Sequence, residues 1–271
     1  MEYFRQATQI DPRNISLLSD YADELCELRQ YSSALRIYDQ ILEISPHDVD
    51  ALTSKAIFYQ SEANLSEAAM LLARIPSDSS PELFPTQVQQ KIYERRFSDA
   101  IAMIHAARGR RDRPMTDSLK TFYDMTLADI QQFSGDIAGA RLTWQQLKTE
   151  IESLPPSKMG SWGTISLLQV RLAVAYAALG EQPKALAIVH EALANQKEDD
   201  QLFTARLAGL RARIAIYAGD RNAAVEQLAI VAQNPVDVDS LDYGDLKLNP
   251  FWDPLRGDPR FENIVNSLAP R

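Results

Sequence analysis

The chain has 271 residues, of which 45% are hydrophobic, and a formal net charge of −9. An acidic surface repels phosphate backbones, so we expect no nucleic-acid partner, and the single cysteine, Cys26, excludes an intrachain disulfide. No apolar run reaches the roughly 18 residues that a membrane span requires, so we expect no span in this chain.

Two successive helices are predicted between Pro12 and Pro46. Apolar residues recur there at the three- and four-residue spacing of an amphipathic helix, first before Arg29 and again after Gln30. The second helix ends near Pro46, because proline lacks the amide proton that a continuing helix needs. The first stripe contains Leu17, Leu18, Tyr21, Ala22 and Leu25, and the second contains Ala34, Leu35, Tyr38, Ile41 and Leu42.

This helix pair recurs with a period of 34 residues. Pro12 is followed 34 positions later by Pro46, and Ala34 is followed at the same interval by Ala68. A self-similarity of this length, built from pairs of helices, is typical of a solenoid of short helical repeats.

On these residues the chain resembles the tetratricopeptide repeat (TPR) proteins. The resemblance implies an all-α fold, in which antiparallel helix pairs wind into a right-handed superhelix. It also implies a protein that binds other proteins and performs no chemistry. The residues that match the large, small and helix-stopping positions of the family are Leu18, Tyr21, Ala22, Leu25, Ala34, Tyr38 and Pro46.

Residues 1–113 are expected to form the N-terminal TPR repeats. The first repeat is incomplete, because residues 3–10 match a second helix whose first helix is absent. We therefore expect the chain to be part of a longer polypeptide. The second full repeat is predicted from Val49 to about Ser80, and a third, less regular repeat from Phe84 to Ala107.

Residues 114–245 are expected to form longer TPR-like repeats. The small residue that opens each second helix moves from Ala100 to Ala140, Ala185 and Ala224, at intervals of 40, 45 and 39 residues. Five positions before each of the last three alanines stands a glycine, where it can end a helix in the left-handed conformation. These glycines are Gly135, Gly180 and Gly219.

Residues 246–271 are expected to form a C-terminal cap. A proline-rich aromatic stretch precedes a short helix that begins after Asp258-Pro259 and carries one apolar face. A solenoid exposes the apolar side of its last pair unless another segment covers it. The stretch 253–261 also resembles the ending of TPR segments at the C-terminus of large bacterial signalling proteins, in which the array follows a kinase, an adenylate cyclase or a winged-helix domain.

No motif for catalysis, metal binding or cofactor binding is found in the sequence. His190-Glu191 begins a zinc-protease pattern, but Ala194 stands where a second histidine would be needed. There is no phosphate-binding glycine loop and no Gly-x-Ser-x-Gly elbow. We therefore predict a protein that is not an enzyme and has no cofactor or metal.

A basic link between the two halves of the array is a secondary candidate site. Arg108, Arg110, Arg111 and Arg113 lie within six residues, and they could hold an acidic or phosphorylated partner through bidentate contacts. The alternative is a solvated loop between repeats, which is the commoner role of such a run.

The concave surface of the solenoid is the primary candidate site, because the first helices of successive pairs line it. Its lining becomes more aromatic and basic in the last three repeats, and arginine and tyrosine are favoured interface anchors. We expect a partner peptide or helix to dock there. The alternative is that several of these side chains pack into neighbouring helices. The predicted partner-binding residues are Asp129, Gln132, Phe133, Arg171, Arg206, Arg213 and Tyr217.

The sequence thus predicts a protein-interaction scaffold that is a regulatory segment of a larger bacterial signalling protein. We expect it in the cytoplasm, or in the periplasm if the parent protein spans a membrane. Two alternatives stay open. One is a sensor that binds a small ligand in the groove, for which a pocket with a few converging polar groups would be diagnostic. The other is a self-associating module, forming a homodimer through the apolar face that the incomplete first repeat leaves uncovered.

Overall fold

The structure is a computed structural model that describes residues 3, 10–27, 30–75, 84–109, 115–158, 166–194, 201–233 and 241–270. In this part of the chain every regular element is helical, which confirms the predicted all-α class. The predicted incomplete repeat lies, apart from Tyr3 and Ile10, outside the described residues. The helices are α2 (Ile15–Glu27), α3 (Tyr31–Ile44), α4 (Val49–Ser61), α5 (Leu65–Leu72), α6 (Phe84–Tyr93), α7 (Phe97–Gly109), α8 (Asp117–Phe133), α9 (Ile137–Ser153), η2 (Pro156–Lys158), α10 (Leu167–Ala178), α11 (Gln182–Ala194), α12 (Gln201–Tyr217), α13 (Arg221–Gln233), α14 (Tyr243–Leu248), η3 (Pro250–Leu255) and α15 (Pro259–Ser267).

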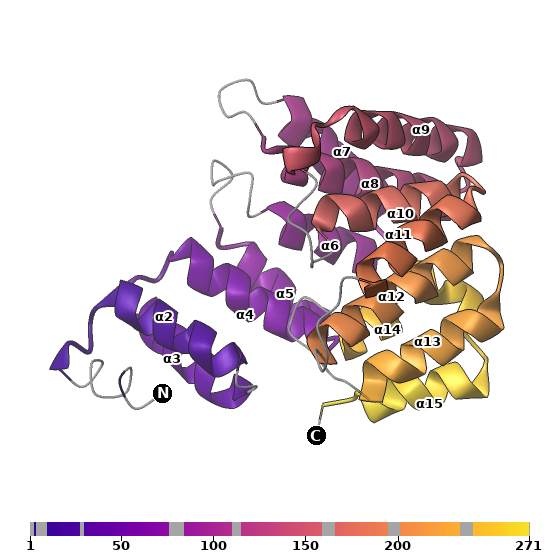
Figure 1. Ribbon diagram of the computed structural model, residues 1–271. Coiled ribbons are helices and arrows are strands. Elements are labelled where there is room, and N and C mark those ends of the chain that lie inside the picture. The colour runs from indigo at the N-terminus through magenta and orange to yellow at the C-terminus, as the bar shows by residue number, and fades with distance from the viewer. Residues whose placement is uncertain are drawn as a thin grey trace.

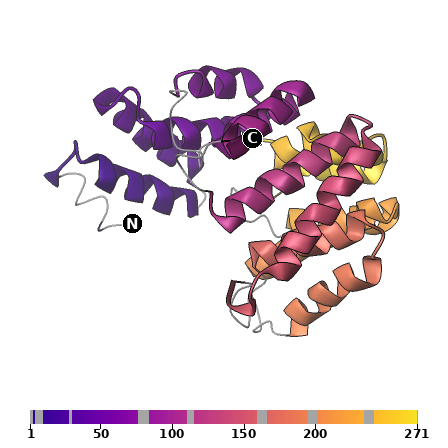
Figure 2. The same ribbon diagram turned by 90° about the horizontal axis from the view of Figure 1, so that it is seen from above.

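The helices of the described part form six successive pairs. α2 packs on α3, α4 on α5, α6 on α7, α8 on α9, α10 on α11 and α12 on α13. Each pair also contacts the next, because α3 touches α4, α5 touches α6, α7 touches α8, α9 touches α10 and α11 touches α12. Figures 1 and 2 show these pairs following one another along a curved array. The predicted TPR-like solenoid is therefore confirmed.

The alanines on which the predicted periodicity rests are buried between the helices. Ala22 of α2 is 0% exposed and Ala34 of α3 is 1% exposed. A side chain this small lets helix axes approach, so that the larger apolar residues beside it can interdigitate. The equivalent alanines of later pairs are equally buried, and they are Ala56, Ala68, Ala100, Ala128, Ala140, Ala173, Ala185, Ala212 and Ala224.

The turn inside each later pair contains a residue in the left-handed conformation. The predicted glycines Gly135, Gly180 and Gly219 have φ angles of +88°, +83° and +76°, a region that glycine enters without a steric penalty. In the second and third pairs Ala63 and Arg95 take the same conformation, at φ angles of 61° and 60°. The turn geometry is therefore shared even where the sequence lacks its usual glycine.

The end of the chain covers the last pair and then reaches further than the sequence predicted. Both α15 and η3 contact α13, as expected of a cap, and Phe261 of α15 is fully buried. However, α14 also contacts α4, and η3 contacts α8. We call residues 241–255 the C-terminal segment. This segment links the end of the array to its N-terminal half, and Figure 1 shows α14 beside the end of the α4–α5 pair.

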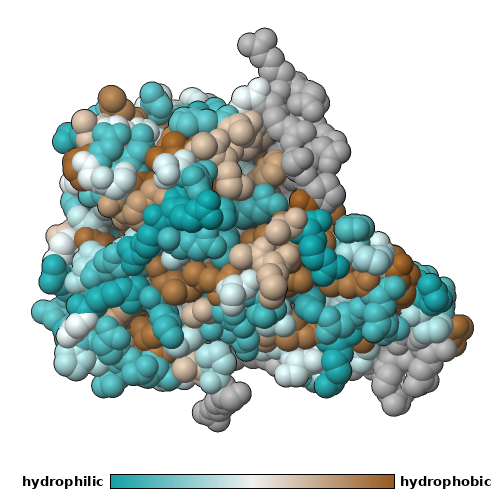
Figure 3. Space-filling view, turned by 180° about the vertical axis from the view of Figure 1, so that it is seen from behind, coloured by the Kyte–Doolittle hydropathy of each residue, from teal (hydrophilic) through white to brown (hydrophobic). Residues whose placement is uncertain are grey.

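One face of the molecule is mostly polar. Figure 3 shows a rear face that is largely hydrophilic, with hydrophobic atoms gathered in a band across its middle. Exposed large apolar side chains such as Met70, Leu142 and Leu167 lie on three different helices, and single exposures of this kind are ordinary. Across the described ranges, no helix combines the length and the apolar character needed to cross a membrane.

Candidate functional site

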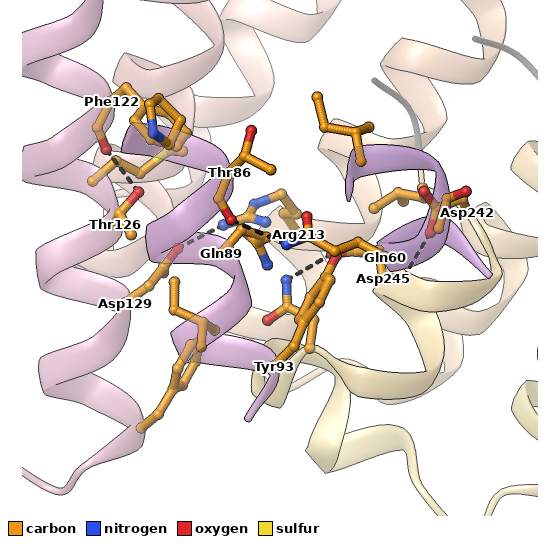
Figure 4. Close-up of a pocket in the computed structure, with 18 residues that line it drawn as sticks. Gln60, Thr86, Gln89, Tyr93, Phe122, Thr126, Asp129, Arg213, Asp242 and Asp245 are labelled. Atoms are coloured by element: carbon orange, nitrogen blue, oxygen red, sulfur yellow. Dashed lines mark hydrogen bonds and ion pairs between the residues drawn. The ribbon is translucent and has the colours of Figure 1, made fainter. Parts of the chain in front are cut away.

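A cavity of about 390 Å³ lies between the solenoid and the C-terminal segment (Figure 4). Its walls come from α4, α6, α8 and α12, which are the first helices of four pairs, and from residues 241–249. The chain's own C-terminal segment therefore forms part of this wall. The lining residues are Ile57, Gln60, Ser61, Pro85, Thr86, Gln89, Ile92, Tyr93, Phe122, Met125, Thr126, Asp129, Phe133, Arg213, Leu241, Asp242, Asp245 and Asn249.

Three of the predicted groove residues bind one another. Asp129 on α8 is buried, and it accepts hydrogen bonds from Arg213 Nη2 at 2.8 Å and from the Tyr217 hydroxyl at 2.5 Å. Figure 4 shows Arg213 reaching Asp129 across the cavity wall. Burial raises the pKa of Asp129, although Arg213 and Tyr217 oppose this shift. These two hydrogen bonds join α8 to α12 within the protein.

Aromatic rings connect the same residues to the C-terminal segment. The Phe251 ring of η3 lies 4.1 Å below the Arg213 guanidinium, a cation–π contact. It also meets Tyr217 edge-on at 5.5 Å and Phe133 at 6.2 Å between ring centroids. Trp144 of α9 contacts the other side of Tyr217 at 5.8 Å. Phe133, Arg213 and Tyr217 therefore hold the chain's own segment.

Arg171 lies apart from this cluster, and it is only 7% exposed. Its Nη1 donates to the Ser118 carbonyl at 2.6 Å and to Thr121 Oγ1 at 2.9 Å. Burial lowers the pKa of its guanidinium to about 10. Arg171 thereby ties α10 to the first turns of α8.

Gln132 and Arg206 are the two predicted groove residues with exposed side chains. For Asp129, Arg171, Arg213 and Tyr217, the contacts match the alternative in which the predicted groove residues pack into neighbouring helices. These side chains make internal contacts because the first helices of the pairs face one another and the C-terminal segment around the cavity.

The residues that hold the C-terminal segment on α6 were missed by the sequence analysis. Asp245 of α14 accepts hydrogen bonds from Trp252 Nε1 at 2.8 Å, from Asn249 Nδ2 at 2.7 Å and from the Tyr93 hydroxyl at 3.3 Å. Arg95, in the turn after α6, donates two hydrogen bonds to the Asp253 carboxylate, from Nη1 at 2.5 Å and from Nη2 at 2.8 Å. The contacts of Tyr93 and Arg95 join positions more than 150 residues apart, so no local spacing signals them.

Gly244 sets how closely α14 approaches α4. A Cβ added at this position would lie 1.9 Å from the backbone oxygen of Gln60, so any larger side chain must push the two helices apart. We expect Gly244→Ala to lower the free energy of unfolding by about 1–3 kcal/mol and to speed amide exchange in α14.

Gly109→Ala provides the matched control, because nothing lies within 4 Å of a Cβ at that position. The two variants should be compared by thermal melting and by hydrogen–deuterium exchange. Equal protection of α14 in both variants would show that the close approach at Gly244 is not formed.

Asp242, the N-cap of α14, makes the docking of this segment sensitive to pH. Burial, with Asp245 nearby, raises its pKa to about 8, whereas an aspartate in an unfolded chain titrates near 3.9. Between these values the folded state holds a proton that the unfolded state has lost, so the free energy of unfolding falls as the pH rises. We expect Asp242→Asn to be more stable than the wild type, by a margin that grows from about pH 5 to about pH 8.

Asparagine keeps the capping oxygen that accepts from the Asp245 amide, so the comparison isolates the charge. Thermal melting of both proteins across this pH range measures the difference. A margin that stays constant with pH would show that Asp242 does not titrate in the folded protein.

The secondary candidate site is described only at Arg108. Its Nη1 lies 3.0 Å from Asp124 Oδ1 of α8, and burial raises the pKa of that aspartate while Arg108 lowers it. Arg110, Arg111 and Arg113 lie outside the described residues. Among the described residues, no group of three or more His, Cys, Asp or Glu side chains is placed to hold a metal ion.

Comparison with known proteins identifies the fold. No protein-family profile matches the chain, and no curated protein matches it. Among solved structures, it is similar to a tetratricopeptide repeat protein from Parabacteroides merdae ATCC 43184, with a TM-score of 0.58 and 13% sequence identity. The match covers 98% of this chain and 90% of the other. The chain therefore has the fold of a TPR-like helical solenoid.

Proposed function

We propose that this protein is a non-catalytic scaffold for protein interactions, which binds a partner peptide or helix on its concave side. The TPR-like fold supports the scaffold role. The observation that carries the choice of site is that the concave side already binds a short helix and the aromatic turn after it, as part of its own chain. A partner would replace this C-terminal segment.

The contacts of the segment suggest what such a partner carries. A small residue is needed opposite Gln60, where Gly244 now lies. A carboxylate is needed to accept a hydrogen bond from the Tyr93 hydroxyl, as Asp245 does now. An aromatic ring fills the place of Phe251 beside Arg213. We therefore propose a partner with one helical turn, an acidic residue within it and an aromatic residue shortly after it.

A labelled peptide with the sequence of residues 241–258 tests this proposal. We expect the peptide to bind the Gly244→Ala protein, whose own segment is loosened, more tightly than the wild type, as measured by fluorescence anisotropy. A peptide in which Phe251 is replaced by alanine is the matched control and should bind more weakly. If neither protein binds the unmodified peptide, the concave side does not act as a peptide site.

We further propose that the scaffold is a regulatory segment of a larger bacterial signalling protein and that it works in the cytoplasm. The ending Asp253-Pro254-Leu255-Arg256 supports this proposal by its resemblance to such proteins. The gene sequence upstream of Met1 is the test, since a kinase, cyclase or winged helix there would agree with the proposal and a chain that starts at Met1 would contradict it. The homodimer stays a prediction, which light scattering after size-exclusion chromatography would test.

The second candidate function is a small-ligand sensor, and the cavity of about 390 Å³ favours it. Ligand sites in proteins commonly occupy cavities of about 300–1,000 Å³ with mainly apolar walls and a few polar groups. Here one wall is the C-terminal segment, so an occupied cavity would favour the docked state of that segment over the released one. A ligand would in this way control access of a partner to the concave side.

A further inference from the structure

Two buried donor atoms at the cavity wall have no acceptor at good hydrogen-bond geometry among the described residues. They are Gln89 Nε2 on α6 and Arg213 Nε on α12, and both side chains line the cavity. Buried donors are normally satisfied, and a donor that is not marks a place where a water or a ligand is bound. Their common need is an acceptor, such as a carboxylate.

The other end of the cavity is acidic, because Asp242 and Asp245 lie there (Figure 4). Among the described lining residues Arg213 is the one basic side chain, and it is paired with Asp129. Asp245 receives three neutral donors from Trp252, Asn249 and Tyr93. Within the described part of the chain, the donors to the Asp242 carboxylate are backbone amides of its own helix. Its ionised form therefore has no counter-charge within the lining, and burial opposes ionisation. An ammonium group beside it would favour the charged form.

Apolar side chains make up much of the remaining wall. Ile57 of α4, Ile92 of α6 and Met125 of α8 line the cavity together with two phenylalanines and Leu241. Such walls accept a hydrocarbon or aromatic side chain and reject a highly polar one.

We propose that this cavity binds a small zwitterionic amino compound, a free α-amino acid with an apolar side chain, whose carboxylate accepts from Gln89 Nε2 and Arg213 Nε and whose ammonium lies at Asp242. This inference rests on the second proposed function and names its ligand class. Because Asp242 caps α14, the ammonium contact joins the ligand to the C-terminal segment. The bound amino acid thus holds that segment against the solenoid.

Isothermal titration calorimetry on the full chain tests the proposal with L-leucine and L-phenylalanine as probes. The matched analogues are leucinamide, which keeps the ammonium and lacks the carboxylate, and 4-methylpentanoate, which keeps the carboxylate and lacks the ammonium. We expect at least one of the amino acids to bind, and each analogue of it to bind at least about tenfold more weakly. Equal binding of an analogue, or no binding of either amino acid, would overturn the zwitterion assignment.

Two variants locate the site. Gln89→Met removes the Nε2 donor and keeps a side chain of similar size. Asp242→Asn removes the negative charge and keeps an oxygen that can cap α14. Each should weaken amino-acid binding at least about tenfold, whereas Asn266→Ala, at an exposed position on α15 outside the cavity, should not change it. Unchanged binding in both cavity variants would place the ligand elsewhere. The labelled-peptide experiment is independent of this one. If the peptide binds and the amino acids do not, the proposed amino-acid site is wrong, whereas the proposed scaffold function is retained.

Discussion

Replacing Asp129 by alanine is expected to lower the free energy of unfolding by about 3–5 kcal/mol. The carboxylate is buried and holds both Arg213 and Tyr217, so its removal leaves a guanidinium without a counter-charge in an interior site. For a chain of this size the melting temperature should fall by roughly 6–20 °C. Thermal unfolding followed by circular dichroism measures the change.

The control is Gln132→Ala on the same helix, which is exposed and should change the stability by less than about 0.5 kcal/mol. A double variant, Asp129→Leu with Arg213→Met, should recover much of the loss, because apolar residues of similar volume can replace a buried ion pair. If Asp129→Ala instead keeps its full stability and loses only partner binding, the pair is an open recognition site, as the sequence first predicted.

The second large effect is expected at Trp252. This side chain is fully buried, meets Phe251 edge-on at 4.9 Å and donates its Nε1 hydrogen to Asp245. Trp252→Ala should cost about 3–5 kcal/mol, through lost apolar burial and the space that it leaves. Because repeats stabilise their neighbours, the loss should spread first to α12 and α13 and reach α2 and α3 least. Hydrogen–deuterium exchange resolves this order.

Asn266→Ala on α15 serves as the control, since that residue is exposed and its replacement should be close to neutral. Trp252→Phe keeps an apolar ring and should lose less stability than the alanine variant. Uniform loss of protection from α2 to α13 would mean that the array unfolds as one unit and that the C-terminal segment does not stabilise the last pair more than the first.

The helices and their pairing could be predicted because they depend on short-range patterns. Buried alanines such as Ala22 and Ala34 recur with the repeat, and Gly135 marks a turn through a conformation that few other residues adopt. These signals act within one helix pair. One pair then packs on the next, so the whole array follows from a local rule.

The docking of the C-terminal segment could not be predicted in the same way. Its contacts depend on three-dimensional proximity, as between Tyr93 and Asp245 or between Arg95 and Asp253. The sequence predicted that residues 246–271 cover the last pair, but not that residues 241–255 also reach α4 and α8. The predicted groove residues lie on the face of each first helix that points away from the second helix of its pair. The C-terminal segment packs against part of this face, so Arg213 and Tyr217 make contacts within the protein.

The most direct test of the account is whether residue 253 lies beside residue 95 in solution. A Cys26→Ser chain carrying Arg95→Cys and Asp253→Cys should be treated with a short bis-maleimide and analysed by peptide mass spectrometry. We expect an efficient intramolecular link, and little linkage in a matched chain with cysteines at Gln132 and Asn266. Failure of the first pair to link, although both thiols react with a single maleimide, would contradict the docking of the C-terminal segment on the concave side.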